Sequence, residues 1–167
     1  MSLVLLLVFV LLLGVVCGLR SMIGPAVICW GAHLGWLQLD HSRLAFLHTI
    51  VSLVVFTVLA LGELVADKLP KTGARTAPGP LAVRFISGAL CGAALCLSAS
   101  RPVVAGIIGG GVGAIAGSFG GYRVRHWLTT ARALPDFPIA ATEDLIALAL
   151  GLLVVSRFMN PAIVPMM

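Results

Sequence analysis

The stretch VVAGIIGGGVGAIAGSFGGY at residues 103–122 carries no charge and is long enough to cross a membrane as a helix. Glycines spaced by four mark one face of that helix, at Gly109, Gly113, Gly117 and Gly121. Gly106 and Gly110 lie in a neighbouring row of the same helix. The preceding apolar run has a similar pair of small residues four positions apart, Gly88 and Gly92. Small faces let helix backbones approach closely within a membrane. We therefore expect these glycines to pack helices within the chain or, alternatively, to form a homodimer seam or the face of a moving helix.

Five more apolar runs flank this stretch: Leu3–Leu19, Met22–Leu37, Leu44–Gly62, Leu81–Ser100 and Ile139–Phe158. The chain has 167 residues, of which 60% are hydrophobic and only 10% are charged, and its mean hydropathy is +1.12. Soluble domains carry about 25% charged residues, and disordered chains are rich in polar residues. The composition therefore excludes an ordinary soluble enzyme and a disordered chain. It predicts an all-α polytopic transmembrane helix bundle with five or six spans.

The number of spans depends on the run Met22–Leu37. A helix needs about 20 residues to cross roughly 30 Å of hydrocarbon, and this run is shorter and opens on Gly24-Pro25. It predicts either a short span or a re-entrant half-helix. The first interpretation gives six spans with both termini outside, and the second gives five spans with the N-terminus inside. In both, residues 1–167 form a single transmembrane domain.

The basic residues are unevenly divided between the two ends of the predicted spans. Eleven Lys and Arg against six Asp and Glu give a net charge of +5. With six spans, one face receives Arg20, Lys68, Lys71, Arg75, Arg123, Arg125 and Arg132, and the other receives Arg43, Arg101 and Arg157. Cytoplasmic loops of membrane proteins carry the excess of Lys and Arg. The bias predicts a multi-pass protein of the inner (plasma) membrane with loops 63–80 and 123–137 in the cytoplasm. It also explains the positive charge without a nucleic-acid partner.

Ionisable residues in and beside the spans are the candidates for a substrate or ion-coupling site: Arg20, Glu63, Asp67, Lys68, Arg75, Arg84, Glu143 and Asp144. Glu63 and Asp67 lie one helical turn apart, whereas Glu143 and Asp144 interrupt an apolar run. Ionisable groups in a span are costly, so they usually face a partner or a water-filled cavity. One interpretation is salt bridging at the cytoplasmic interface. The other is a polar site where carboxylates take up protons or a cation while arginines hold an anionic group.

The remaining residue types give no sign of catalytic or metal chemistry. Four cysteines lie in apolar runs without a CxxC pair and are expected to be small packing residues: Cys17, Cys29, Cys91 and Cys96. The four histidines are scattered and do not predict a metal site. The sequence contains neither HExxH nor GxSxG. We therefore expect no metal, no cofactor and no enzymatic activity.

A short motif occurs twice and predicts an internal repeat. The segment RSMIGPAV at 20–27 resembles RTAPGPLAV at 75–83. Each has an arginine, then a hydroxyl residue, then a Gly-Pro pair that opens an apolar helix. Repeated halves with broken or short helices are common in small transporters, where the binding site lies between the halves. The halves would cover about residues 1–70 and 71–158.

Several stretches resemble a family of small bacterial integral membrane proteins known only as a domain of unknown function, number four-one-two-six in its series. The stretches are GLRSMIGPAV at 18–27, GELVADKLP at 62–70, RTAPGPLAVR at 75–84 and SGALCG at 87–92, with the glycine-rich run and Glu143-Asp144. They extend over residues 11–157, and GELVADKLP is the most specific of them. The resemblance implies a multi-span helical membrane protein and no particular activity.

The leading hypothesis for function is a small transporter or permease for a small solute, proton-coupled through the carboxylates and arginines. The alternative is a non-catalytic scaffold or accessory subunit that binds another membrane protein through its glycine face. A third hypothesis, an intramembrane enzyme acting on lipid, requires a polar groove open to the bilayer. The expected partners are the lipid bilayer, a small molecule or ion, and further copies of the chain in a homo-oligomer.

Overall fold

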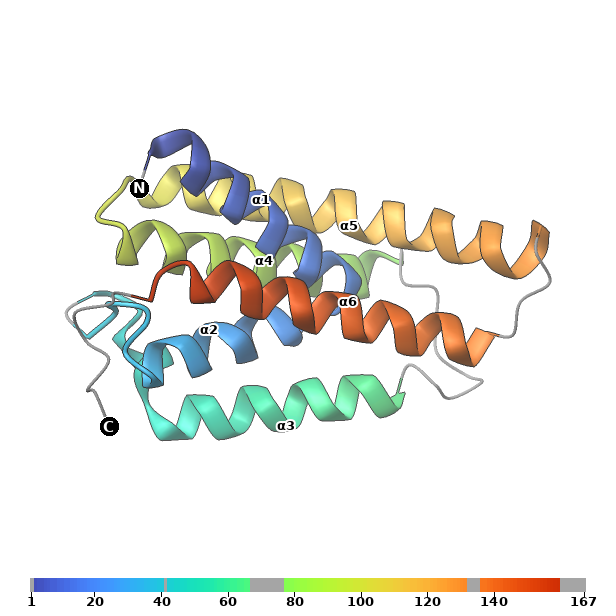
Figure 1. The fold of residues 1–167 in the computed structure, drawn as a ribbon, viewed down its shortest axis with the longest axis horizontal. Coiled ribbons are helices and arrows are strands. Elements are labelled where there is room, and N and C mark those ends of the chain that lie inside the picture. Colours follow the sequence, from blue (N-terminus) through green and yellow to red (C-terminus); the bar gives the residue numbers. More distant parts are fainter. Residues whose placement is uncertain (1, 41, 67–76, 132–135, 160–167) are drawn as a thin grey trace.

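A computed structural model describes residues 2–40, 42–66, 77–131 and 136–159. These residues form an all-α bundle (Figure 1). Its helices are α1 (Leu3–Leu19), α2 (Ile23–His33), α3 (Ile50–Ala66), α4 (Pro78–Ser98), α5 (Val103–Ala131) and α6 (Asp136–Ser156), with a 3-10 turn, η1 (Ala45–His48), before α3. The all-α prediction is confirmed, and α1 coincides with the first predicted run.

Three helices contain segments long and apolar enough to cross a membrane: Pro78–Ser98, Val103–Thr130 and Pro138–Ser156. Two shorter apolar helices, α1 and α3, have 17 residues each. Many large apolar side chains on the outside of the bundle are exposed, among them Val51, Val65 and Leu145. An outer surface of this kind is typical of a protein that lipid solvates.

Successive helices run in opposite directions (Figure 1). Gly88 and Gly92 of α4 lie against Gly110 and Gly106 of α5, so these two helices are antiparallel. Other pairs fix the remaining directions: Arg20 with Asp144 for α1 and α6, Ser21 with Glu63 for α2 and α3, and Gly14 with Gly113 for α1 and α5. The C-terminal ends of α1, α3 and α5 therefore lie at the same end of the bundle as the N-terminal ends of α2, α4 and α6. We call this the junction end, because it contains the junction between α1 and α2.

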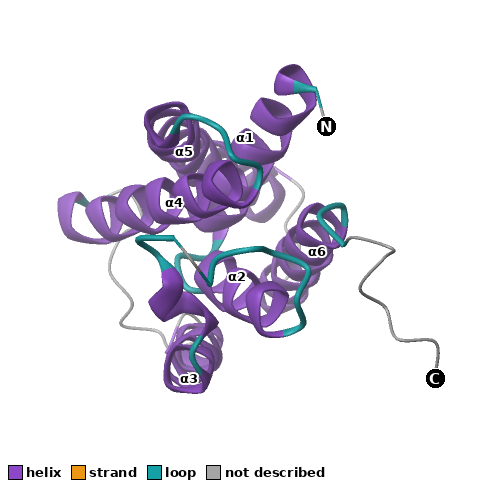
Figure 2. Cartoon of the chain, turned by 90° about the vertical axis from the view of Figure 1, so that its left-hand side faces the viewer, coloured by secondary structure: helices purple, strands orange, loops and turns teal. Residues whose placement is uncertain are grey.

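Helices α1, α4 and α5 form one close-packed group, and α2, α3 and α6 lie beside it (Figure 2). Glycine brings the first group together, because the backbone of α5 contacts α4 on one side and α1 on the other. A Cβ atom added at Gly110 would collide with the carbonyl of Gly88, and one added at Gly14 would collide with the carbonyl of Gly110. At these positions α5 approaches α4 and α1 so closely that only glycine fits without a shift of the helices.

Helix α2 is much shorter than its neighbours. Its 11 residues extend only about 16 Å at 1.5 Å per residue, roughly half of the hydrocarbon thickness. Pro25 and Pro80 lie in the first turns of α2 and α4, where the missing N–H costs nothing. The two Gly-Pro pairs therefore open helices, as the repeated motif predicts. The division into repeated halves stays a prediction.

Helix α5 continues beyond the predicted end of its apolar run. The uncharged run ends at Tyr122, and residues 123–137 were predicted to form a cytoplasmic loop. The structure keeps α5 helical to Ala131 and starts α6 at Asp136. No glycine or proline interrupts residues 122–131, so the helix has no local reason to stop.

Candidate functional site

The candidate site is built around the junction between α1 and α2, where Arg20, Ser21 and Met22 separate the two helices. Arg20 caps α1 with an extended backbone, and its N–H donates to the carbonyl of Val16. Nearby, the Ser118 hydroxyl on α5 donates to the carbonyl of Gly18 at 3.1 Å. The last turn of α1 is thereby tied to α5.

The Arg20 side chain is completely buried and is paired with Asp144 of α6. Its Nε and Nη2 atoms both lie 2.5 Å from Oδ1 of Asp144, whose side chain is 13% exposed. A buried guanidinium cannot lose its proton, so it requires a negative partner. Asp144 supplies that charge, which explains why an acidic residue stands in the apolar sequence of α6.

Glu63 of α3 binds the N-terminus of α2. Its Oε1 accepts from the backbone N–H of Ser21 at 2.8 Å and from the Ser21 hydroxyl at 2.7 Å, and its Oε2 accepts from the N–H of Met22 at 2.8 Å. Amide groups at a helix start have no partner within the helix, and the helix dipole favours a negative charge there. Glu63 therefore acts as a cap supplied by a neighbouring helix.

Replacing Glu63 with Ala should lower the free energy of unfolding by about 1.5–3 kcal/mol, because charged hydrogen bonds to buried amides are lost. Glu63→Gln keeps an acceptor without the charge and should lose less. Reversible unfolding of the protein in mixed detergent micelles measures both changes. Val65→Ala, at an exposed position of the same helix, is the control. Equal stability of all three variants would show that Glu63 does not cap α2.

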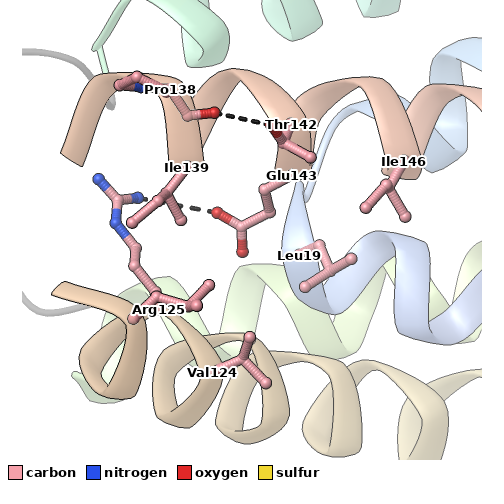
Figure 3. Close-up of a pocket in the computed structure, with 10 residues that line it drawn as sticks. Leu19, Val124, Arg125, Pro138, Ile139, Thr142, Glu143 and Ile146 are labelled. Atoms are coloured by element: carbon pink, nitrogen blue, oxygen red, sulfur yellow. Dashed lines mark hydrogen bonds and ion pairs between the residues drawn. The ribbon is translucent and has the colours of Figure 1, made fainter. Parts of the chain in front are cut away.

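Glu143 and Asp144 point away from each other although they are adjacent in sequence. Consecutive residues of a helix are about 100° apart around its axis. Asp144 turns toward Arg20, while Glu143 turns toward α5, where its Oε2 lies 3.7 Å from Nη1 of Arg125 (Figure 3). Both side chains of this second pair are mostly buried, with 18% of Arg125 and 11% of Glu143 exposed. The two acids of α6 thus connect it to two different helices.

Each acid also lines a cavity of its own. Asp144 lines a cavity of about 590 Å³ between α2, α3 and α6, together with Trp30 and Thr57. The Trp30 indole N–H donates to the Thr57 hydroxyl at 3.2 Å. Glu143 and Arg125 line a cavity of about 500 Å³ between α5, α6 and the end of α1. The walls of both cavities are otherwise largely apolar.

The structure brings most of the predicted ionisable residues to the junction end. Arg20, Glu63, Glu143 and Asp144 all lie at this end, although the contacts described above join only Arg20 to Asp144. Arg84 is buried on α4, one turn from Gly88 toward the same end. Three other predicted residues, Asp67, Lys68 and Arg75, lie outside the described residues. Whether these side chains bind a solute or couple ions stays a prediction.

Sequence reasoning missed two participants in this cluster. Arg125 was counted only as a basic residue of a loop. In the structure it belongs to α5, and its side chain pairs with Glu143 of α6. Ser21 was noted only as part of a repeated motif, yet it supplies two donors to Glu63. A hydroxyl residue directly after an arginine at a helix break was the available signal for Ser21.

The packing residues are each placed against a neighbouring helix. Gly88 and Gly92 contact α5, and the row from Gly109 to Gly121 runs along α1, with Gly109 at Val10, Gly113 at Leu11, Gly117 at Val15 and Gly121 at Leu19. The four cysteines are buried, and Sγ of Cys17 lies 3.7 Å from Sγ of Cys91. Within the described ranges, no three His, Cys, Asp or Glu side chains are grouped as a metal site would require.

The fold and the site define a class: a helical protein with the spans of a multi-pass membrane protein and a buried ionic cluster at a helix junction. The chain belongs to the family described as Domain of unknown function (DUF4126), whose model matches residues 7–164. No curated protein and no solved structure shows significant similarity to the chain. The family membership predicted from the sequence is confirmed.

Proposed function

We propose that the protein is a small transporter or permease of the inner (plasma) membrane that carries a small anionic solute together with a proton. The 590 Å³ cavity carries this proposal. It is large enough for a small solute, and it is lined by Asp144, which pairs with the buried Arg20. The alternating helix directions support six spans, with the junction end and the loops 63–80 and 123–137 in the cytoplasm.

The need for charge balance at Arg20 explains how solute binding could be coupled to proton binding. The buried guanidinium needs one negative partner at all times, since an uncompensated buried charge is strongly destabilising. With Asp144 ionised, that partner is Asp144. When Asp144 takes up a proton, an anionic solute can replace it at the guanidinium. Proton and anion then bind together, and the cluster keeps the same net charge in both states.

The break between α1 and α2 suits such a site. In transporters with interrupted helices, the N-terminus of a half-helix points at the anionic group of the substrate. Here that position is held by the Glu63 carboxylate, on three hydrogen bonds to Ser21 and Met22. Glu63 would fix α2 in place while Arg20 and Asp144 exchange the solute.

Filling the cavity should stop transport. Ala60 lines the cavity and is 8% exposed, so Ala60→Phe places a ring where the solute would bind. Uptake of radiolabelled monocarboxylates, dicarboxylates and phosphate into proteoliposomes under an inward proton gradient measures the effect, with a neutral sugar and a cationic amino acid as contrasts. Ala60→Phe should reduce anion uptake to the level of empty liposomes. Val58→Phe, on the exposed face of the same helix, should transport normally.

The Asp144→Asn variant tests whether Asp144 couples solute uptake to the proton gradient. If Asp144 carries the proton, this variant should lose the response of uptake to the proton gradient. An unchanged response would contradict the coupling role. If none of the solutes enters above the level of empty liposomes, the transport proposal itself is contradicted.

The scaffold hypothesis gains no support from the glycine row, because α1 of the same chain covers the row from Gly109 to Gly121. A homo-oligomer, which we still propose as the working assembly, would have to form through another face of the bundle. The exposed apolar side chains of α3, such as Val51 and Val58, provide one such face.

A further inference from the structure

The 500 Å³ cavity between α5 and α6 differs in character from the cavity beside Asp144. Its apolar lining comes from the end of α1 and from both walls, at Leu19, Val124, Leu128, Ile139 and Ile146. Arg125 and Glu143 lie across it from one another, one on each wall (Figure 3). The cavity therefore combines an apolar groove with the Arg125–Glu143 ion pair at its rim.

The length of α5 places this groove at the edge of the hydrocarbon. Its 29 residues extend about 43 Å, which exceeds the roughly 30 Å of a bilayer core. The residues from Tyr122 onward therefore reach the headgroup layer when the run from Val103 crosses the core. Tyr122 and Trp127 are 46% and 52% exposed there, as aromatic residues at a membrane interface typically are.

The charges around the groove favour an anion. Arg123 and His126 are exposed on α5 on either side of Arg125. Among the described residues that line the groove, Glu143 is the one acid, and it lies 3.7 Å from Arg125. A guanidinium has five N–H donors, so Arg125 can bind a phosphate while it remains near Glu143.

We propose that this groove binds one anionic phospholipid of the surrounding bilayer. The phosphate lies at Arg125, and an acyl chain lies along the apolar lining between α5 and α6. A free phosphate ion would leave the apolar lining unused, and a zwitterionic lipid would gain less from the basic rim. Basic pockets between membrane helices bind anionic lipid headgroups by the same means. This inference does not depend on the transport proposal, because it concerns a different cavity.

A tryptophan at a lining position makes the proposal measurable. Trp127 lies two positions after Arg125 and therefore faces away from the groove, whereas Val124 lines it. Val124→Trp combined with Trp30→Phe, Trp36→Phe and Trp127→Phe leaves a single tryptophan, and this reporter protein is used throughout. The protein is placed in phosphatidylcholine vesicles that contain the same fraction of brominated phosphatidylglycerol or brominated phosphatidylcholine. Quenching of the tryptophan at position 124 then reports which lipid occupies the groove. We expect phosphatidylglycerol to bind about fivefold more strongly, the preference that one basic side chain near the surface provides.

Three variants distinguish a built site from a general attraction to basic protein. Arg125→Gln should abolish the preference for phosphatidylglycerol, and Arg125→Lys should keep part of it. Arg123→Gln removes the same charge two residues away, at an exposed position that does not line the groove. It should leave most of the preference intact. Glu143→Gln should raise the preference, because it removes the carboxylate that lies beside Arg125 in the groove.

Two results would overturn the proposal. The first is equal quenching by the two brominated lipids in the reporter protein that keeps Arg125 and Glu143. The second is an equal loss in Arg123→Gln and Arg125→Gln, which would show only a diffuse surface charge. If Arg125→Gln does not fold, the reporter protein and its Glu143→Gln variant still test the proposal, since they predict a preference and an increase in it.

Discussion

Gly110→Ala should lower the free energy of unfolding by about 1–3 kcal/mol, the usual cost of overpacking a close contact. Gly110 lies where α5 contacts both α4 and α1, and an added methyl group would collide with the backbone carbonyl of Gly88. A carbonyl cannot rotate away as a flexible side chain can, so one of the helices must shift. Reversible unfolding in mixed micelles, followed by circular dichroism, measures the loss.

Gly120→Ala is the matched control on the same helix. No atom lies within 4 Å of a Cβ added at Gly120. Alanine is the better helix former by about 1 kcal/mol, so this variant should be as stable as the unsubstituted protein or more so. If Gly110→Ala and Gly120→Ala behave alike, the close contact of α4, α5 and α1 is not the source of stability that the structure indicates.

Asp144→Asn should lower the free energy of unfolding by about 3–5 kcal/mol, because it leaves the buried Arg20 guanidinium without its counter-charge. Arg20 is completely buried, and its Nε and Nη2 atoms both contact the same oxygen of Asp144. The amide of asparagine can accept a hydrogen bond but cannot balance the charge. The same unfolding measurement in micelles detects this loss.

An exposed contact between an aspartate and a histidine provides the control for Asp144→Asn. Asp40 lies 3.0 Å from His48, and the two side chains are 54% and 45% exposed. Exposed pairs contribute less than about 1 kcal/mol, so Asp40→Asn should be nearly neutral. A loss at Asp144 no larger than the loss at Asp40 would show that burial does not strengthen the Arg20–Asp144 pair.

The helices could be predicted from the sequence wherever an apolar run had clear ends. Leu3–Leu19 is one example, and it ends at the charge of Arg20. The end of α5 was missed because hydropathy falls at Arg123 while helix propensity continues. Hydropathy marks where a chain leaves the lipid, and it does not mark where a helix stops.

The ionisable residues could be selected from the sequence, but their partners could not. The sequence does not show that Glu63 binds the amides of Ser21 and Met22. Nor does it show that the adjacent residues Glu143 and Asp144 contact different helices. The rotation of each helix about its axis decides these partners, and that rotation depends on packing such as the glycine contacts of α1, α4 and α5.

A double-mutant cycle between Arg20 and Asp144 tests most directly whether the ionic residues meet inside the bundle. The free energy of unfolding is measured for Arg20→Leu, Asp144→Leu and the double variant. The structure predicts strong coupling, so that the double variant is more stable than either single variant, because replacing both members of a buried pair by apolar residues is often neutral. Losses that simply add would contradict the account, since they would mean that the two side chains do not interact.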